Sequence, residues 1–339
     1  MKTKFNPFNN VEIFYESLVN SLENASDHIS LLYYTFDHGV WSKRISDVLS
    51  KKVKNGVKVD LMIDNLGLIL DNTKNAFQSR LFINDLISSG IEVNLFKPKN
   101  VSFDKTKRLH IKMCAIDDDV ALIGGSNIGD HYVNWRDSNI LIKGNFGNTF
   151  HDLYDYVYSF SNNSSFDELQ MKKMEKSYSS GLKIGDFEIL LTVPDEHHDI
   201  YESLLSIISN SERELYIRTW YFLPGREIMD SIMAQIKDGI RVKILISNKT
   251  RVRPIDWIGK FYVRKLANAG AEIYRYKKSY MHSKVYWNDN SEILFGSANL
   301  NSLEFNKNFE LSLKLKNTPL NKELSDFFSE DQKDSILVK

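Results

Sequence analysis

Apolar residues in the first third of the chain follow two different patterns. Some stretches have the mixed apolar and polar sequence of a helix with one buried face, and others are short continuous apolar runs typical of a buried strand. Asn-Gly at 55–56 and Gly90 end two of the helical stretches. The predicted elements are, in order, helix 11–24, strand 29–36, helix 41–54, strand 57–63, helix 80–89 and strand 91–96.

The same layout occurs twice in the chain. Six residues of one motif recur at a constant spacing of 172 residues, which chance does not readily produce. Upstream of the motif the match continues with a drifting register, as loops of different length would cause. The six pairs are His110 and His282, Lys112 and Lys284, Asp117 and Asp289, Gly124 and Gly296, Gly125 and Ser297, and Asn127 and Asn299.

Each repeat reads as one domain in which strands alternate with helices. Strands that are apolar along their length predict an α/β sheet with helices over both faces. The polar sequence Ser-Asn-Asn-Ser-Ser at 161–165 is the clearest linker signal between the repeats. We therefore expect two α/β domains, over residues 1–165 and 166–339.

A His and a Lys two residues apart stand at the centre of each repeat. Strand-like sequence surrounds them, and on a strand this spacing places both side chains on one face. A turn and a second apolar strand follow, and small residues at the end of that strand precede an Asn. Small residues there let a ligand approach the backbone closely. Each repeat therefore projects an imidazole, an ammonium and an amide from neighbouring strand ends.

These three groups suit the chemistry of a phosphodiester. A Lys can hold phosphate oxygens and offset the charge that develops in the transition state. One His can attack phosphorus while another protonates the leaving alkoxide, so the reaction needs both repeats. A lone His in a strand is usually structural, whereas the doubled arrangement favours function. Asp117 and Asp289 stand at β-turns, and we expect both to be structural.

The doubled pattern His-x-Lys-x4-Asp-x6-Gly-(Gly/Ser)-x-Asn resembles the motif of the phospholipase D superfamily, the HKD proteins. The resemblance covers residues 11–316. It implies two α/β/α sandwich halves with mixed sheets, related by a pseudo-twofold axis and sharing one active site. It also implies a covalent phosphohistidine intermediate, with no metal ion and no other cofactor.

The resemblance also assigns roles to the motif residues. His110 is expected to be the nucleophile and His282 the general acid, although the near-symmetry of the motifs allows the opposite assignment. The residues expected to hold the phosphoryl oxygens are Lys112, Lys284, Asn127 and Asn299.

Members of the superfamily place a carboxylate after each motif, where it fixes the tautomer of a His. Asp137 and Glu310 occupy these positions here, and we expect them to orient the imidazoles. The remaining small residues of the motif are expected to be structural, and they are Gly124, Gly125, Gly296 and Ser297.

Residues around the motifs further resemble the bacterial cardiolipin synthases, more in their shorter form than in the long form with N-terminal membrane helices. The similar segments are 125–130 with Trp135-Arg136-Asp137, and 296–300 with Asn308-Phe309-Glu310. Those enzymes move a phosphatidyl group to a glycerol-type acceptor. The resemblance therefore implies a phosphatidyltransferase that acts on an anionic glycerophospholipid. A hydrolase on the same scaffold, either a phospholipase D or a nuclease, stays open, because the sequence does not decide whether an alcohol or water takes the second step.

Composition narrows these alternatives. The 44 Lys and Arg residues balance the 44 Asp and Glu residues, which disfavours a nuclease because proteins that bind nucleic acid usually carry a basic excess. Cys114 is the only cysteine, so a disulfide scaffold is excluded.

No apolar run reaches the ~18 residues that span a bilayer, and the N-terminal residues do not resemble a secretory signal. We expect a cytoplasmic protein.

Two apolar segments raise the question of membrane contact. Leu66–Leu70 follows a predicted strand end, and Trp257, Ile258, Phe261 and Tyr262 lie on a predicted helix. An apolar stripe at helical spacing is more often part of a core, so both core packing and contact with lipid stay open for each segment. We expect peripheral contact with the inner face of the cell membrane.

Overall fold

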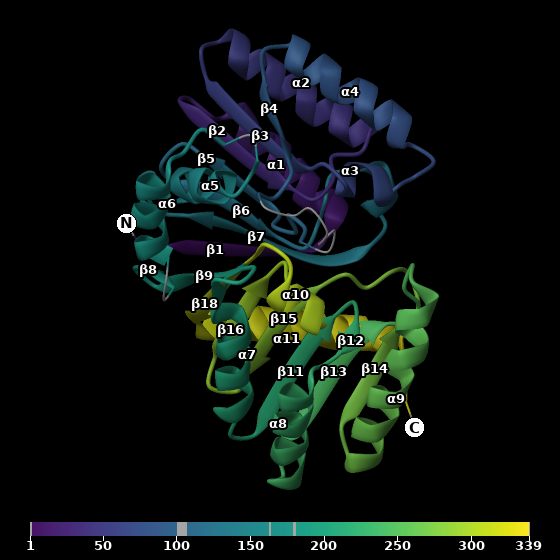
Figure 1. Ribbon diagram of the computed structural model, residues 1–339. Helices are drawn as coiled ribbons and strands as arrows, with labels where there is room; N and C mark the ends of the chain where they lie inside the picture. Colours follow the sequence, from purple (N-terminus) through teal and green to yellow (C-terminus); the bar gives the residue numbers. More distant parts are fainter. Residues whose placement is uncertain (1, 100–106, 163, 179–180, 339) are drawn as a thin grey trace. The chain divides into compact units, whose positions relative to one another are not determined.

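The computed structural model describes residues 2–99, 107–162, 164–178 and 181–338. The chain forms two compact units (Figure 1). Unit 1 consists of Met1–Val133 and Asn139–Ser180, and unit 2 consists of Asn134–Ser138 and Gly181–Lys339. A five-residue segment from the first half of the sequence thus belongs to unit 2.

Unit 1 is built from a mixed sheet with helices packed on it. Its strands are β1 (Lys4–Asn10), β2 (His28–Tyr33), β3 (Lys58–Asp64), β4 (Glu92–Phe96), β5 (Met113–Ile116), β6 (Val120–Gly124) and β7 (Arg136–Lys143), the last of which begins in the segment assigned to unit 2. Its helices are α1 (Val11–Glu23), α2 (Val40–Lys54), α3 (Gly67–Leu70), α4 (Ala76–Ser88), α5 (Thr149–Ser159) and α6 (Glu168–Tyr178), with a 3₁₀ turn at Asp130–Tyr132.

Unit 2 has the same kind of architecture. Its strands are β8 (Leu182–Ile184), β9 (Phe187–Val193), β10 (His197–His198), β11 (Glu214–Thr219), β12 (Phe222–Leu223), β13 (Arg241–Ser247), β14 (Glu272–Tyr276), β15 (Lys284–Asn288), β16 (Glu292–Gly296), β17 (Leu300–Asn301), β18 (Glu310–Lys316) and β19 (Ser335–Leu337). Its helices are α7 (Asp199–Ser209), α8 (Arg226–Lys237), α9 (Arg253–Ala269), α10 (Ser302–Asn306) and α11 (Thr318–Lys333).

The two main sheets share one strand order. The sheet of unit 1 runs β1-β7-β6-β5-β2-β3-β4, and the main path in unit 2 contains β9-β18-β16-β15-β11-β13-β14. In unit 1, β2, β3 and β4 are parallel, whereas β5 runs antiparallel to both β2 and β6. The equivalent strands of unit 2 pair in the same senses. The prediction of a repeated α/β fold with mixed sheets is confirmed.

Helices cover both faces of each sheet. In unit 2, apolar side chains of α7, α8 and α9 form one buried cluster with side chains of β11, β13 and β14. On the opposite face, Tyr216 stacks on Trp287 at a centroid distance of 4.9 Å, and Phe328 of α11 packs edge-on against Tyr216 at 5.3 Å. In unit 1, α1, α2 and α4 lie on one side of the sheet and α5 lies on the other (Figure 1). Because both faces of each sheet are buried, the strands are apolar along their length.

The relative directions of the strands determine where the repeated motifs lie. Because β5 is antiparallel to β6, the residues before β5 and the residues after β6 meet at one edge of the sheet. The same holds for β15 and β16 in unit 2. Parallel strands β2 and β3 end at this edge in unit 1, as β11 and β13 do in unit 2. Each unit therefore gathers its His, Lys and Asn at the edge of the sheet where loops are free to form a site.

One detail of the predicted motif is wrong. The prediction places both the His and the Lys inside a strand, but β5 begins at Met113, after His110 and Lys112, and β15 begins at Lys284, after His282. The ladder between β5 and β2 ends at the pair Met113–Leu32, so the chain before it has left the sheet. This places the imidazoles beyond the end of the β-ladder.

Among the described residues, no helix combines the length and apolar character that crossing a bilayer requires.

Candidate active site

His282 of unit 2 is held by a buried carboxylate from a distant part of the sequence. Its Nδ1 lies 2.8 Å from Oδ2 of Asp137, and both side chains are buried. Burial alone would raise the pKa of Asp137, but the charges of His282 and Lys284 outweigh it and hold that pKa below its ordinary value. The carboxylate is therefore ionised at neutral pH and can only accept a hydrogen bond. This favours the tautomer with a proton on Nδ1, in which Nε2 carries the lone pair.

The backbone of residues 134–138 brings Asp137 to this position. The amide of Arg136 donates to the carbonyl of Tyr280 over 2.8 Å, and the amide of His282 donates to the carbonyl of Arg136 over 2.7 Å. These two bonds form a short parallel bridge between Arg136 and Met281. The side chain of the next residue, Asp137, then lies beside the imidazole.

A buried ion pair network supports the same segment. Asp331 of α11 accepts from Nε of Arg136 and from Nη2 of Arg218, each over 2.5 Å. Arg218 on β11 and Asp331 are both fully buried. Desolvation raises the pKa of Asp331 even though both guanidinium groups oppose that effect. Since removing one partner of a buried pair is strongly destabilising, this network fixes the position of Arg136 and hence of Asp137.

Lys284 lies directly beneath His282. Its Nζ donates to the carbonyl oxygen of His282 and lies 2.7 Å from Nδ1 of the ring. Nδ1 can donate to Asp137 or accept from Lys284, and the ionised carboxylate favours the first arrangement. Burial lowers the pKa of Lys284 to about 8, although Asp137, Glu304 and Glu310 act in the opposite direction. The Lys284 side chain is therefore positively charged at neutral pH and loses its proton in mildly alkaline solution.

Aromatic rings surround the imidazole of His282. The ring of Trp220 lies edge-on at a centroid distance of 4.4 Å, and that of Trp135 lies at 5.4 Å. Trp135 also packs against Tyr280 at 4.9 Å. These rings restrict the rotation of the imidazole and exclude water from one side of it, which strengthens the electrostatic interactions there.

Asn299 is oriented by a carboxylate that sequence reasoning did not identify. Its Nδ2 donates to Oε1 of Glu304 over 2.6 Å, and its backbone amide donates to Oε2 over 2.7 Å. A carboxylate can only accept, so Nδ2 must face Glu304. The other amide atom, Oδ1, is buried and has no hydrogen-bond partner among the described residues.

Glu310 is fully buried at the start of β18. It accepts a 2.5 Å hydrogen bond from Oγ of Ser297 and a longer one of 3.4 Å from Nδ2 of Asn308. Ser297, expected to be structural, also accepts from the amide of Leu311 over 3.0 Å and so joins the motif to β18. The role of Glu310 as an orienting carboxylate stays a prediction.

The first motif repeats part of this geometry in unit 1. Nζ of Lys112 donates to the carbonyl oxygen of His110 over 2.5 Å, as Lys284 does to His282. The ring of Tyr34 lies edge-on to His110 at 5.6 Å, with Nζ of Lys112 5.7 Å from the centroid of Tyr34. Lys112 is buried and His110 is partly buried.

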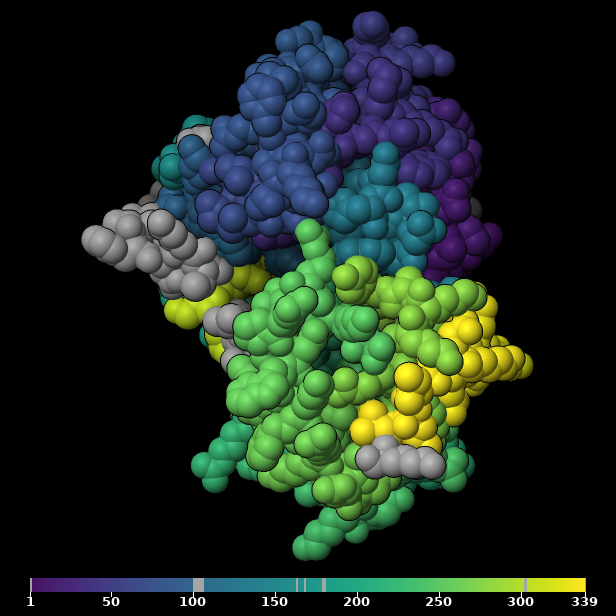
Figure 2. Space-filling model, turned by 90° about the vertical axis from the view of Figure 1, so that its right-hand side faces the viewer, coloured from purple at the N-terminus to yellow at the C-terminus, as the bar shows by residue number. Residues whose placement is uncertain are grey.

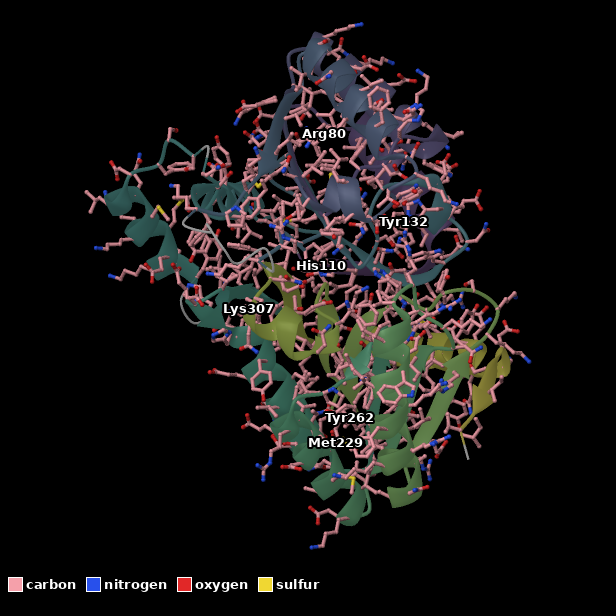
Figure 3. The ribbon with its side chains drawn as sticks, turned by 45° about the vertical axis from the view of Figure 1, so that its right-hand side comes forward. Arg80, His110, Tyr132, Met229, Tyr262 and Lys307 are labelled. Atoms are coloured by element: carbon pink, nitrogen blue, oxygen red, sulfur yellow. The ribbon has the colours of Figure 1, made fainter. Side chains whose placement is uncertain are left out.

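Asn127 is oriented through a tyrosine. The hydroxyl of Tyr132 donates to Oδ2 of Asp71, so it must accept from Nδ2 of Asn127, which lies 3.3 Å away. Tyr15 holds the backbone of the same Asn by donating to its carbonyl over 2.5 Å. His110 and Tyr132, both labelled in Figure 3, come from the same edge of the first sheet. Oδ1 of Asn127, like Oδ1 of Asn299, is buried without a hydrogen-bond partner among the described residues.

Asp117 and Asp289 bind backbone amides rather than facing the site. Asp117 accepts from the amides of Ser26, Asp27 and His28 over 2.8–3.0 Å. Asp289 accepts from the amides of Glu212, Arg213 and Glu214 at the start of β11, over 3.1–3.2 Å, and these bonds lower its pKa to about 2 despite the opposing effect of burial. Each Asp ties the turn after the His-Lys strand to the loop before the central parallel strand.

The glycines of the motif allow strands to approach closely. A Cβ at Gly296 would lie 2.2 Å from the carbonyl oxygen of Leu311, so only glycine fits between β16 and β18. Gly124 ends β6 and pairs with Asn139, and its amide donates to the carbonyl of Lys112 over 3.2 Å. Gly125 follows and is buried.

Sequence reasoning missed the residues that orient the Asn amides. Tyr132 and Glu304 each follow the motif Asn by five positions, so they are 172 residues apart, like the six motif pairs. Because a Tyr and a Glu have different side chains, comparing the two repeats for identical residues does not reveal this pair. Asp331 and Arg218 left no comparable signal, because no spacing rule links them to the motif.

A family model described as "Cardiolipin synthase, PLD-like domain" matches residues 18–155 and 204–332. The chain is 30% identical to a cardiolipin synthase of Clostridium perfringens strain 13, over 94% of this chain and 68% of that protein. It is 28% identical to the major cardiolipin synthase ClsA of Bacillus subtilis strain 168, over 94% of this chain and 66% of that protein.

Among solved structures, the phosphatidylserine synthase of Haemophilus influenzae Rd KW20 has a similar fold. The TM-score is 0.75 at 14% sequence identity, and the match covers 99% of this chain and 87% of that one. The doubled motif, the shared strand order and the matching family model agree, and the chain belongs to the phospholipase D-like family of cardiolipin synthases.

Proposed function

We propose that this enzyme is a phosphatidyltransferase of cardiolipin synthase type. It takes a phosphatidyl group from an anionic glycerophospholipid and passes it to a glycerol-type acceptor. The observation that carries the proposal is the doubled set of a His, a Lys and an oriented Asn, with the tautomer of one His set by Asp137. A reaction that must alternate between attack on phosphorus and protonation of an alkoxide needs two imidazoles, and each unit supplies one.

In the first step, Nε2 of His110 attacks the phosphorus of the donor lipid. His282 enters this step as the imidazolium, with the proton on Nδ1 held by Asp137 and a second proton on Nε2. The bond from phosphorus to the leaving oxygen breaks, and Nε2 of His282 gives its proton to that oxygen, which leaves as an alcohol. The product of this step is a phosphatidyl group bound covalently to His110. The buried pair of His282 and Asp137 suits a proton donor, so the attack on phosphorus is assigned to the other imidazole, His110.

In the second step, a hydroxyl of the acceptor attacks the same phosphorus. His282 takes the hydroxyl proton, the bond between phosphorus and His110 breaks, and the new phosphodiester leaves. Lys112, Lys284, Asn127 and Asn299 hold the phosphoryl oxygens in both steps, and the ammonium groups offset the charge that develops on them. Glu310 acts as a second orienting carboxylate. No metal ion or other cofactor takes part in this sequence.

A product assay by mass spectrometry tests the proposal. Purified protein is incubated with phosphatidylglycerol vesicles, with and without added glycerol and EDTA, beside the variant His110→Ala. We expect diphosphatidylglycerol to form in the presence of EDTA and to be absent with His110→Ala. Phosphatidic acid as the only product would instead indicate a hydrolase. Activity that EDTA removes and a divalent ion restores would refute the metal-free mechanism.

The covalent intermediate can be tested separately. Rapid denaturation at neutral to mildly alkaline pH, which preserves the acid-labile bond between phosphorus and nitrogen, is followed by mass spectrometry of the protein. It should detect a phosphatidyl group on His110 in the variant His282→Ala when the donor has a leaving group that needs no proton, such as 4-nitrophenolate, because only the second step then lacks its base. If the adduct appears on His282 in a His110→Ala protein instead, the two roles are exchanged. Full turnover by His110→Ala would overturn the phosphohistidine mechanism altogether.

The proposed substrate also places the enzyme at a lipid surface. We propose that it acts from the cytoplasm as a peripheral protein on the inner face of the cell membrane. A phospholipid with two long acyl chains stays in the bilayer, so a water-exposed enzyme must bind that surface to reach the phosphodiester. Fractionation of cells should therefore find the protein with membranes and release it with high salt or alkaline carbonate.

A further inference from the structure

Helix α9 of unit 2 exposes large apolar side chains to solvent. Trp257 is 77% exposed and Phe261 is 68% exposed, and Ile258 beside them is 45% exposed. Trp257 and Phe261 stand four positions apart and so lie on one face of the helix. In Figure 1, α9 lies at the outer side of unit 2, and Figure 2 looks onto that side. Exposed aromatic residues in a contiguous group mark an interaction surface rather than a scatter of single residues.

The opposite face of α9 holds the helix to its unit. Val263 and Leu266 are buried in the core cluster, and Tyr262 packs against the same cluster, which includes Met229 (Figure 3). The sequence left open whether Trp257, Ile258, Phe261 and Tyr262 pack in the core or contact lipid. The structure separates them, because Tyr262 faces inward and the other three are exposed. The aromatic pair is therefore not required for folding of the core.

Basic side chains flank the aromatic pair. Helix α9 carries Arg253, Lys260, Arg264 and Lys265, all of them exposed, against one acidic residue, Asp256. On a helical wheel, Arg264, Lys260 and Arg253 lie on one side of Trp257, and Lys265 lies beyond Phe261 on the other. Apolar aromatic residues between cationic ones are the pattern of a helix that lies in the interface of an anionic membrane.

A second exposed apolar pair lacks this charge. Phe77 and Leu81 of α4 are 71% and 49% exposed, but that helix carries only Arg80 and Asp85, whose charges cancel. The first apolar segment singled out in the sequence is also different, because Leu68 is buried and Leu70 is the member most exposed. Exposed apolar side chains therefore occur in both units. Of these three segments, α9 is the one that combines exposed apolar side chains with a net positive charge.

We propose that α9 is the surface by which the enzyme docks on an anionic phospholipid bilayer. Trp257 and Phe261 insert among the headgroups and upper acyl chains, while the flanking Lys and Arg side chains contact lipid phosphates. The charge complementarity selects anionic lipid over zwitterionic lipid, and the exposed aromatic pair selects a bilayer over a nucleic acid. This inference rests on the proposed function in assuming that the substrate is a membrane phospholipid.

Vesicle co-flotation of the full chain tests the proposal. The vesicles contain phosphatidylglycerol and phosphatidylcholine, or phosphatidylcholine alone. We expect the double variant Trp257→Ser/Phe261→Ser to bind the anionic vesicles about tenfold more weakly or worse, and Lys260→Glu/Arg264→Glu to lose the preference for anionic lipid. The matched control Phe77→Ser/Leu81→Ser should bind like the unmodified protein. Unchanged binding by the α9 variants, or an equal loss in the control, would overturn the proposal.

Two further measurements separate this proposal from the proposed function. Turnover of a short-chain phosphatidylglycerol, kept below its micelle concentration, should be the same in the α9 aromatic variant and the unmodified protein. A loss there would show that Trp257 and Phe261 act on catalysis rather than on docking and would refute the proposal. Complete absence of lipid turnover would refute the proposed function, while flotation would still decide on docking. DNA binding that depends on Lys260 and Arg264 but not on the aromatic pair, together with unchanged flotation, would assign the surface to nucleic acid instead.

Discussion

Asp137 and His282 are 145 positions apart in the sequence, and Oδ2 of the carboxylate lies 2.8 Å from Nδ1 of the ring. Asp137 follows the first motif along the chain but is hydrogen-bonded to the imidazole of the second. The resemblance to known sequences placed a carboxylate after each motif without saying which His it serves. Asp137 contacts the His of the second motif because residues 134–138 belong to unit 2.

Replacing Asp137 with Asn should slow turnover far more than it disturbs the fold. The amide cannot accept from Nδ1 with the charge of the carboxylate, so the ring loses its preferred tautomer. By comparison with carboxylates that orient a catalytic His, we expect kcat to fall by about 10³-fold or more. Circular dichroism should stay unchanged. The matched control is Asp238→Asn at an exposed position of the same unit, and an equal loss in both variants would contradict an orienting role.

The buried ammonium of Lys284 predicts an alkaline limit to activity. Burial lowers its pKa to about 8, against the ordinary value of 10.5, so its positive charge is present below pH 8 and lost above it. We expect kcat/KM to decline as the pH rises through about 8. The variant Lys284→Arg stays charged in this range and should show a flat alkaline limb at a lower maximum rate.

Stability should move in the opposite direction to activity over this pH range. Between about pH 8 and 10.5 the unfolded Lys284 binds more protons than the folded one, so this residue makes unit 2 more stable as the pH rises. A decline in turnover while the urea midpoint holds or increases would separate loss of charge from unfolding. Activity that is constant up to pH 10 would show that Lys284 keeps its proton.

Glu304 and Tyr132, which bind the side-chain amides of Asn299 and Asn127, should each contribute to catalysis. Glu304→Gln places an amide donor against the Asn299 backbone N–H and removes the charge that orients Nδ2, and we expect kcat to fall by about tenfold. Tyr132→Phe should have a similar effect through Asn127. In an Asn299→Ala background, Glu304→Gln should add little, because the residue acts through the amide. Additive losses would instead indicate an independent contribution, and Glu202→Gln at an exposed site is the control.

Gly296 should be intolerant of even a methyl group. A Cβ there would lie 2.2 Å from the Leu311 carbonyl oxygen and 2.2 Å from Oγ of Ser312. Since both strands are held by the sheet, Gly296→Ala should lower the free energy of unfolding by about 1–3 kcal/mol or more, measured by urea denaturation. Gly225→Ala, where a Cβ would meet nothing within 4 Å, should change it by less than about 0.5 kcal/mol.

Much of the fold follows from local pattern. The predicted helix over 11–24 is observed as Val11–Glu23, and the predicted strand over 57–63 as Lys58–Asp64, because apolar spacing and the glycine stops are local signals. The doubled motif predicted the two repeats and the residues gathered at each sheet edge. The strand limits around His110 and His282 differ because they depend on where pairing with the neighbouring strand ends, which the sequence of one strand does not contain.

The supporting contacts of the site were beyond sequence reasoning for a different reason. Asp331 reaches Arg136 across 195 positions and Arg218 across 113, and both bonds depend on the packing of α11 against the sheet. Exposure is similarly a property of packing. The stripe of Trp257, Ile258 and Phe261 reads like a core stripe, and only the position of α9 on the unit shows that it faces solvent.

The membership of residues 134–138 in unit 2 has a consequence for synthesis on the ribosome. Asp137 emerges early, but the residues that hold its segment, Tyr280 and Asp331, are translated only later. The hydrogen bond between Asp137 and His282 can therefore form only after the second motif has been made. A nascent chain that carries the complete first motif has Asp137 but not its partner His282, and a fragment that starts after the linker would lack the carboxylate altogether. The order of the sequence thus delays formation of the Asp137–His282 pair until most of unit 2 has been synthesised.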